Sequence, residues 1–83
     1  MITTATIGLP YAAWYLGWFD DAKDKSLEEK AHEAKERFVA KFGAEPRVVL
    51  MNEKDAGDLL TLGGMRVRPR EYVRPNHFWV GSD

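Results

Sequence analysis

The side chains that could bind metals or move protons are two histidines and thirteen carboxylates. The chain contains no cysteine. Residues 32–36, His-Glu-Ala-Lys-Glu, match only the first half of a zinc-protease helix motif. That motif needs a second histidine four positions after the first, so that both imidazoles share one helix face. Glu36 stands at that position. We therefore predict a solvated helix flank with no bound metal.

Three aspartates, Asp20, Asp21 and Asp24, could in principle gather a hard cation. A calcium loop requires oxygen ligands alternating through twelve residues, with a central glycine and a closing glutamate. That spacing is missing here. The three residues are interpreted as an acidic linker that precedes a helix.

His77 lies beside two aromatic residues, Phe78 and Trp79. A general base needs an orienting carboxylate and a nucleophile or bound water within reach. The two serines suit other roles, because Ser26 begins a helix and Ser82 is next to the last residue. We expect His77 to be a strand-edge residue bonded to backbone, and we predict no catalytic residue.

The glycines of this chain do not match the phosphate-binding loop motif. Met65 follows Gly63-Gly64, whereas the motif requires Lys-Ser/Thr after its last glycine. They indicate a turn, and no cofactor is predicted. The absence of cysteine excludes disulfides and thiolate metal sites.

An arginine-rich stretch is the most suggestive feature. Four arginines fall within nine positions, interleaved with one tyrosine: Arg66, Arg68, Arg70, Tyr72 and Arg74. Guanidinium groups bind carboxylates or phosphates bidentately, and aromatic rings can stack on bases. The alternative is a solvated strand edge whose arginines deter aggregation. The stretch thus allows an acidic protein partner, a nucleic acid, or a purely protective role.

Three tryptophans, Trp14, Trp18 and Trp79, are many for an 83-residue chain. Tryptophan is rarely enclosed completely, and tryptophan, tyrosine and arginine dominate interface hot spots. Core packing remains the alternative. We predict that these tryptophans, His77 and the arginine stretch contact a protein partner or a second copy of the chain.

The segments around these residues have recognisable periodicities. Residues 2–8 are rich in β-branched types and predict a strand. Residues 11–19 fit either a strand or a helix weakened by Gly17; we prefer a strand that pairs with residues 2–8 across Leu9-Pro10. Alternation along this strand would then place Trp14, Leu16 and Trp18 on one face of the sheet and the residues between them on the other face.

Residues 26–42 predict the clearest helix. Ser26 and Glu29 form a capping box, and Gly43 supplies a C-terminal stop. The apolar stripe at helical spacing consists of Leu27, Ala31, Ala34, Phe38 and Phe42.

The second half of the chain alternates short elements. We predict a buried central strand over 47–51 and a helix over 53–60 capped by Asn52. Beyond the Gly63-Gly64 turn, Met65 and Val67 should face inward. Prolines place residues 66–75 at a sheet edge or in a loop. A turn at Pro75-Asn76 should lead into a last strand over 77–80.

The whole chain therefore predicts one α+β domain spanning residues 1–83. Its small mixed sheet has four to five strands, with one long and one short helix on one face, in the order β-β-α-β-α-β-β. The net charge of −1 argues against a global affinity for nucleic acid or membranes. We expect a cytoplasmic, non-catalytic binding or assembly module that binds a protein partner or forms a homo-oligomer. The alternative is a nucleic-acid-binding domain that uses the Arg66–Arg74 edge.

Overall fold

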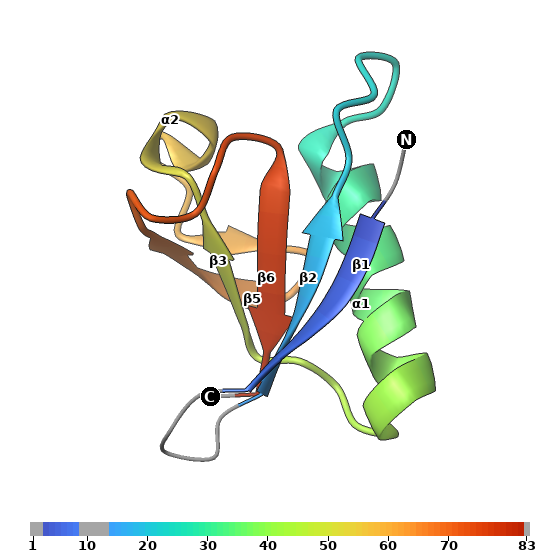
Figure 1. Cartoon of the computed structure of the whole chain (residues 1–83). Helices are drawn as coiled ribbons and strands as arrows, with labels where there is room; N and C mark the ends of the chain where they lie inside the picture. Colours follow the sequence, from blue (N-terminus) through green and yellow to red (C-terminus); the bar gives the residue numbers. More distant parts are fainter. Residues whose placement is uncertain (1–2, 9–13, 83) are drawn as a thin grey trace.

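A computed structural model describes the backbone of residues 3–8 and 14–82 and the side chains of residues 15–82. Six strands form one mixed sheet in the order β1-β2-β6-β3-β5-β4 (Figure 1). The strands are β1 (Thr3–Gly8), β2 (Trp14–Phe19), β3 (Val48–Met51), β4 (Thr61–Leu62), β5 (Met65–Pro69) and β6 (His77–Gly81). The pairing of β3 with β5 is parallel, and the other four pairings are antiparallel. The predicted α+β class with a mixed sheet is confirmed.

The long helix α1 (Leu27–Phe42) begins and ends as its sequence predicts. The Ser26 hydroxyl accepts from the Glu29 amide at 3.1 Å, and the Glu29 carboxylate accepts from the Ser26 amide. Both bonds satisfy groups that the first helical turn leaves without partners. At the other end Gly43 has φ 71°, a left-handed conformation that favours glycine, and its N–H donates to the Val39 carbonyl.

The main core lies between α1 and the face of the sheet that we call the inner face. α1 contributes Ala31, Ala34 and Phe38, all nearly inaccessible to solvent. Every strand from β2 to β6 adds at least one buried apolar side chain to this cluster. The short helix α2 (Glu53–Ala56) adds Ala56 to the same cluster, so both helices cover the inner face.

The opposite face, which we call the outer face, is covered by neither of the helices that the described residues form. A second, smaller cluster lies there, formed by Tyr15, Val48 and Leu50 with Val73 from the loop that connects β5 to β6. Figure 1 shows that loop (orange) passing in front of β3 before the chain enters β6. Val73 is fully buried. A residue of this loop thus packs against the apolar side chains of the outer face.

The structure corrects several predicted boundaries. The second helix ends at Ala56 instead of residue 60, because Gly57 has φ 52° and leaves the helical conformation. The chain then forms the unpredicted β4, joined to β5 by a tight turn in which Gly63 and Gly64 both have positive φ. β4 pairs with Met65 and Arg66, so only the start of β5 is second from the sheet edge. Arg68 and Pro69 extend past β4, and residues 70–76 form a loop, as predicted.

The N-terminal hairpin is confirmed where it is described. β1 pairs with β2 in one unbroken antiparallel register, from Thr3 opposite Phe19 to Gly8 opposite Trp14. Leu9-Pro10 lies outside the described residues. The predicted helical stripe needs one correction: Phe42, at the end of α1, is 37% exposed, and its ring centroid lies 4.6 Å from that of Phe38.

Phe38→Ala should destabilise the domain by about 3–5 kcal/mol, because it leaves a cavity in the main core. Phe42→Ala removes an identical ring from a half-covered site and should cost about 1 kcal/mol. Urea denaturation followed by tryptophan fluorescence measures both. Equal losses for the two variants would contradict the described packing of α1.

Candidate binding surface

Side chains of four arginines and four aromatic residues lie on the outer face and on the loop beside it. In β5 the inward residues Met65 and Val67 are buried, whereas Arg66 is exposed and Arg68 half-buried. The alternation predicted for this strand is confirmed. In β6 the same alternation buries Phe78 and Val80 in the main core and turns His77 and Trp79 outward.

The loop of residues 70–76 carries the remaining predicted residues, and several hydrogen bonds hold it in place. The Asn52 side chain caps α2 by accepting from the Lys54 amide at 2.9 Å, and its Nδ2 donates to the Val73 carbonyl at 2.8 Å. The Asp55 carboxylate accepts from the Asn76 amide at 2.7 Å. One short helix and its cap therefore fix both the middle and the end of the loop.

The end of the loop is also tied to β2. The Asp20 amide donates to the Asn76 carbonyl at 3.0 Å. Asn76 has φ 65°, a left-handed conformation that asparagine tolerates better than most residues. The turn predicted at Pro75-Asn76 is thus confirmed. Bonds on both sides of Asn76 determine where the chain enters β6.

Aromatic rings form two pairs on the outer face. Tyr72 is 60% exposed, and its ring centroid lies 5.7 Å from that of Trp79, which is half-buried over the small cluster. The rings of Phe19 and His77 lie 4.8 Å apart. His77 Nδ1 is 3.0 Å from the Pro75 carbonyl, so this nitrogen carries the proton and donates to backbone. That matches the structural role expected for His77.

The arginines of the surface have no acidic side chain within ion-pair distance among the described residues. Within residues 15–82, none of the side chains of Arg66, Arg68, Arg70 and Arg74 forms an ion pair. Arg70 donates from Nη1 to the neighbouring Pro69 carbonyl at 2.7 Å. A hollow of about 760 Å³ adjoins Arg66. Its lining is Arg47, Val48, Leu60, Thr61, Gly64, Arg66 and Val67.

Trp18, also predicted to contact a partner, is buried on the inner face with 3% of its surface exposed. Strand alternation from Tyr15 turns Trp18 away from Trp79, so the two do not share a surface. Trp18 is therefore a core residue. Trp14 belongs to β2, but its side chain lies outside the described residues.

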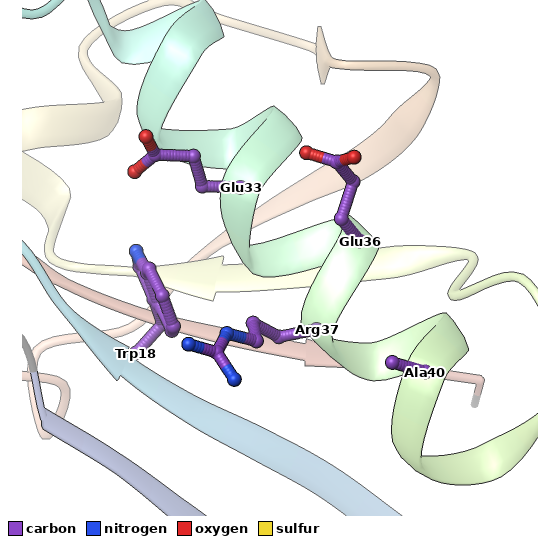
Figure 2. A pocket seen from close by; sticks show the side chains of 5 residues that line it. All are labelled: Trp18, Glu33, Glu36, Arg37 and Ala40. Atoms are coloured by element: carbon purple, nitrogen blue, oxygen red, sulfur yellow. The ribbon is translucent and has the colours of Figure 1, made fainter.

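A hollow of about 520 Å³ adjoins Trp18 and is lined also by Glu33, Glu36, Arg37 and Ala40 (Figure 2). The Arg37 guanidinium lies 5.9 Å from the indole centroid, within cation–π range. Trp18 Nε1 is buried and has no hydrogen-bond partner among the described residues. Figure 2 shows this nitrogen on the side of the indole nearer Glu33.

A small charge cluster joins the start of α1 to the end of β2. Lys25 Nζ lies 3.0 Å from the Glu33 carboxylate and 3.4 Å from buried Asp20. Burial works to raise the pKa of Asp20, but the amide of Ala22 and the Lys25 ammonium outweigh it and lower that pKa. The bond to Glu33 raises the pKa of Lys25. Asp20 is thus a buried anion stabilised by the Ala22 amide and the Lys25 ammonium.

The described residues contain no group of three or more side chains placed to hold a metal ion. His32 Nε2 lies 3.5 Å from Glu36, and both side chains are well exposed, as predicted for a helix flank. No helix in the described part of the chain is long and apolar enough to cross a membrane. Comparisons with protein families, curated proteins and solved structures found no match to this chain.

Asn52→Asp should separate the two roles of this side chain, because a carboxylate can still cap α2 but cannot donate to Val73. We expect a loss of about 1–2 kcal/mol in unfolding free energy and faster amide exchange confined to residues 70–76. Asn52→Ala removes both bonds and should cost more. Wild-type stability and exchange in the Asp variant would show that the loop does not depend on this bond.

The lowered pKa of Asp20 predicts a dependence of stability on pH. Since the folded-state pKa lies below the unfolded value, the stabilisation is present above the unfolded value, about 3.9. It is lost as pH falls through the folded-state pKa. Asp20→Asn should therefore cost roughly 1–3 kcal/mol at pH 7 and less at pH 2. Urea denaturation at both pH values measures the difference, and a penalty independent of pH would exclude the carboxylate as its source.

Proposed function

We propose that this chain is a non-catalytic binding module whose outer face binds an acidic segment of a protein partner. The observation that carries the proposal is the set of arginines without ion-pair partners beside the Tyr72–Trp79 ring pair. Guanidinium groups recognise carboxylates through two parallel hydrogen bonds. A carboxylate-bearing ligand would supply the counter-charge that the described residues do not.

The spacing on β5 suits an extended ligand. Arg66 and Arg68 project from the same side of one strand, and alternate residues of a strand are about 7 Å apart. Alternate carboxylates of an extended peptide have the same spacing. The exposed Tyr72 ring and the 81% exposed Leu60 offer apolar contacts next to the charges. Tyrosine, tryptophan and arginine are the side chains that dominate binding energy at protein interfaces.

A second copy of the chain fits this particular face poorly. A two-fold contact places the same patch of both copies together. Such a contact would bring the arginine-rich patches of both copies together, and like charges in contact cost several kcal/mol. For this reason we assign the outer face to an acidic partner.

Single-stranded nucleic acid is the second candidate. The Tyr72–Trp79 ring pair favours it, because one face of an exposed ring can stack on a base while arginines contact phosphates. The two candidates differ in what Tyr72 contributes. Stacking makes the ring essential for a nucleic acid, whereas an acidic peptide depends mainly on the arginines.

A fluorescein-labelled peptide of twelve glutamates tests the proposal by anisotropy at low salt. We expect saturable binding, which Arg66→Glu with Arg68→Glu weakens by about tenfold or more, since two charge-assisted bonds are lost. The matched control is Lys23→Glu with Lys41→Glu, which changes the net charge equally at exposed sites off this face. The control should stay within about twofold of wild type.

Two outcomes would overturn the proposal: the peptide fails to bind, or both double variants weaken it equally, which would indicate net charge alone. Single-stranded oligo-dT and oligo-rU of twelve nucleotides complete the test. If either oligonucleotide binds more tightly than the peptide and loses about tenfold with Tyr72→Ala, the nucleic-acid alternative replaces the acidic segment.

A further inference from the structure

The two edges of the sheet differ in how well they are protected. The β4 edge is two residues long, and Pro69 ends the neighbouring β5. The β1 edge is six residues long, with the sequence Thr-Thr-Ala-Thr-Ile-Gly. It contains no charged residue and no proline, and its register with β2 has no bulge. Charges, prolines and bulges are the devices that keep edge strands from pairing with other chains.

The hydrogen-bond directions at the β1 edge follow from the sheet. Successive residues of a strand direct their backbone groups to opposite sides. Asp20 donates toward β6, so in β2 the residues Tyr15, Gly17 and Phe19 point to β1. Their partners in β1 are Ile7, Ala5 and Thr3. The intervening residues, Thr4 and Thr6, therefore direct their N–H and C=O groups to the open side of the sheet.

We propose that β1 pairs antiparallel with β1 of a second copy of this chain, which joins the two sheets into one. Antiparallel pairing of identical strands generates a two-fold axis perpendicular to the sheet. An uncharged strand meets no like charge when it pairs with itself. The axis keeps both α1 helices on one side of the joined sheet and runs them in opposite directions.

The flank of α1 that faces this edge has self-complementary charges. Lys35 donates to the Gly63 carbonyl, which places that side of α1 over the β4–β5 turn. The opposite side bears Glu33, Glu36 and Arg37 beside the hollow over Trp18 (Figure 2). Two acidic side chains and one arginine thus lie on the same side of α1. Because the two helices of the dimer would be antiparallel, Arg37 of each copy would lie near the glutamates of the other.

Distances allow these side chains to meet. Paired strands are about 4.8 Å apart, so the two copies of β2 would be separated by about 14 Å across the two β1 strands. α1 packs against β2 and β6, and the two copies of β6 would be about 24 Å apart. Only long side chains such as glutamate and arginine would therefore bridge the two helices. The outer faces of both copies lie together on the other side, so the dimer would present two arginine surfaces to one partner.

Sedimentation velocity of the full chain at about 10–200 µM tests the proposal with a matched pair of substitutions. Thr6→Pro removes an N–H directed at the open β1 edge, a position where strands tolerate proline. We expect it to raise the dimer dissociation constant by about tenfold or more, while circular dichroism and the melting temperature stay close to wild type.

Thr61→Pro is the control on the other edge. Val67 donates to the Leu60 carbonyl, so Thr61 of β4 directs its N–H away from β5. This variant should leave the dimer unchanged. If Thr6→Pro fails to fold, Thr4→Lys tests the same edge, because a lysine on each strand repels its copy across the two-fold axis. Arg37→Glu should also weaken the dimer.

The proposal would be overturned if the wild type is a monomer at 200 µM, or if it forms a dimer that the substitutions in β1 do not weaken. If only Thr61→Pro weakens the dimer, the contact is at β4 instead. The outcome is independent of the function proposed for the outer face. Arg66→Glu with Arg68→Glu should leave the dimer intact, and Thr6→Pro should leave peptide binding to each monomer intact.

Discussion

The fold depends on how an open sheet with both helices on one side shields its other side. α1 and α2 both pack on the inner face, so apolar residues of β2 and β3 on the outer face would be exposed to solvent unless another segment covered them. Val73 supplies that cover from a loop, and it is fully buried. Burying a valine contributes about 1.5–3 kcal/mol, enough to hold the loop against the sheet when polar bonds at its ends are also made.

This constraint explains why the cationic surface is ordered. Val73 alone would leave its neighbours free to rotate, but Asn52 and Asp55 bond the middle and the end of the same loop, and Asp20 bonds its exit. The loop therefore presents Arg70, Tyr72 and Arg74 in fixed positions beside β5. A ligand that meets a preorganised surface loses less binding energy to ordering it. This preorganisation supports the binding role that we propose for the arginines.

Much of the fold could be predicted because its signals are local. The capping box at Ser26, the stop at Gly43 and the apolar run of β3 each specify an element within a few residues. The alternation of β5 likewise placed Arg66 and Arg68 outward. The Gly63-Gly64 pair signals a two-residue hairpin, and it could have revealed β4, which lies directly before it.

Long-range features could not be predicted in the same way. Whether a strand residue faces a helix or an open face depends on which side of the sheet the helices cover, so Trp18 and Trp79 could not be separated in advance. The bond between Asn52 and Val73 joins residues 21 positions apart. No spacing rule relates an N-cap to a distant loop, although asparagine's paired donor and acceptor make such a double role possible.

Backbone ¹⁵N relaxation of residues 70–76 tests most directly whether the loop is held on the outer face. An ordered loop predicts order parameters of about 0.85, equal to those of β3 and β6, in the chain without any ligand. Values below about 0.6 for Tyr72, Val73 and Arg74 would contradict it. The arginines would then have no fixed arrangement, and the binding surface described for the outer face would not exist before a partner arrives.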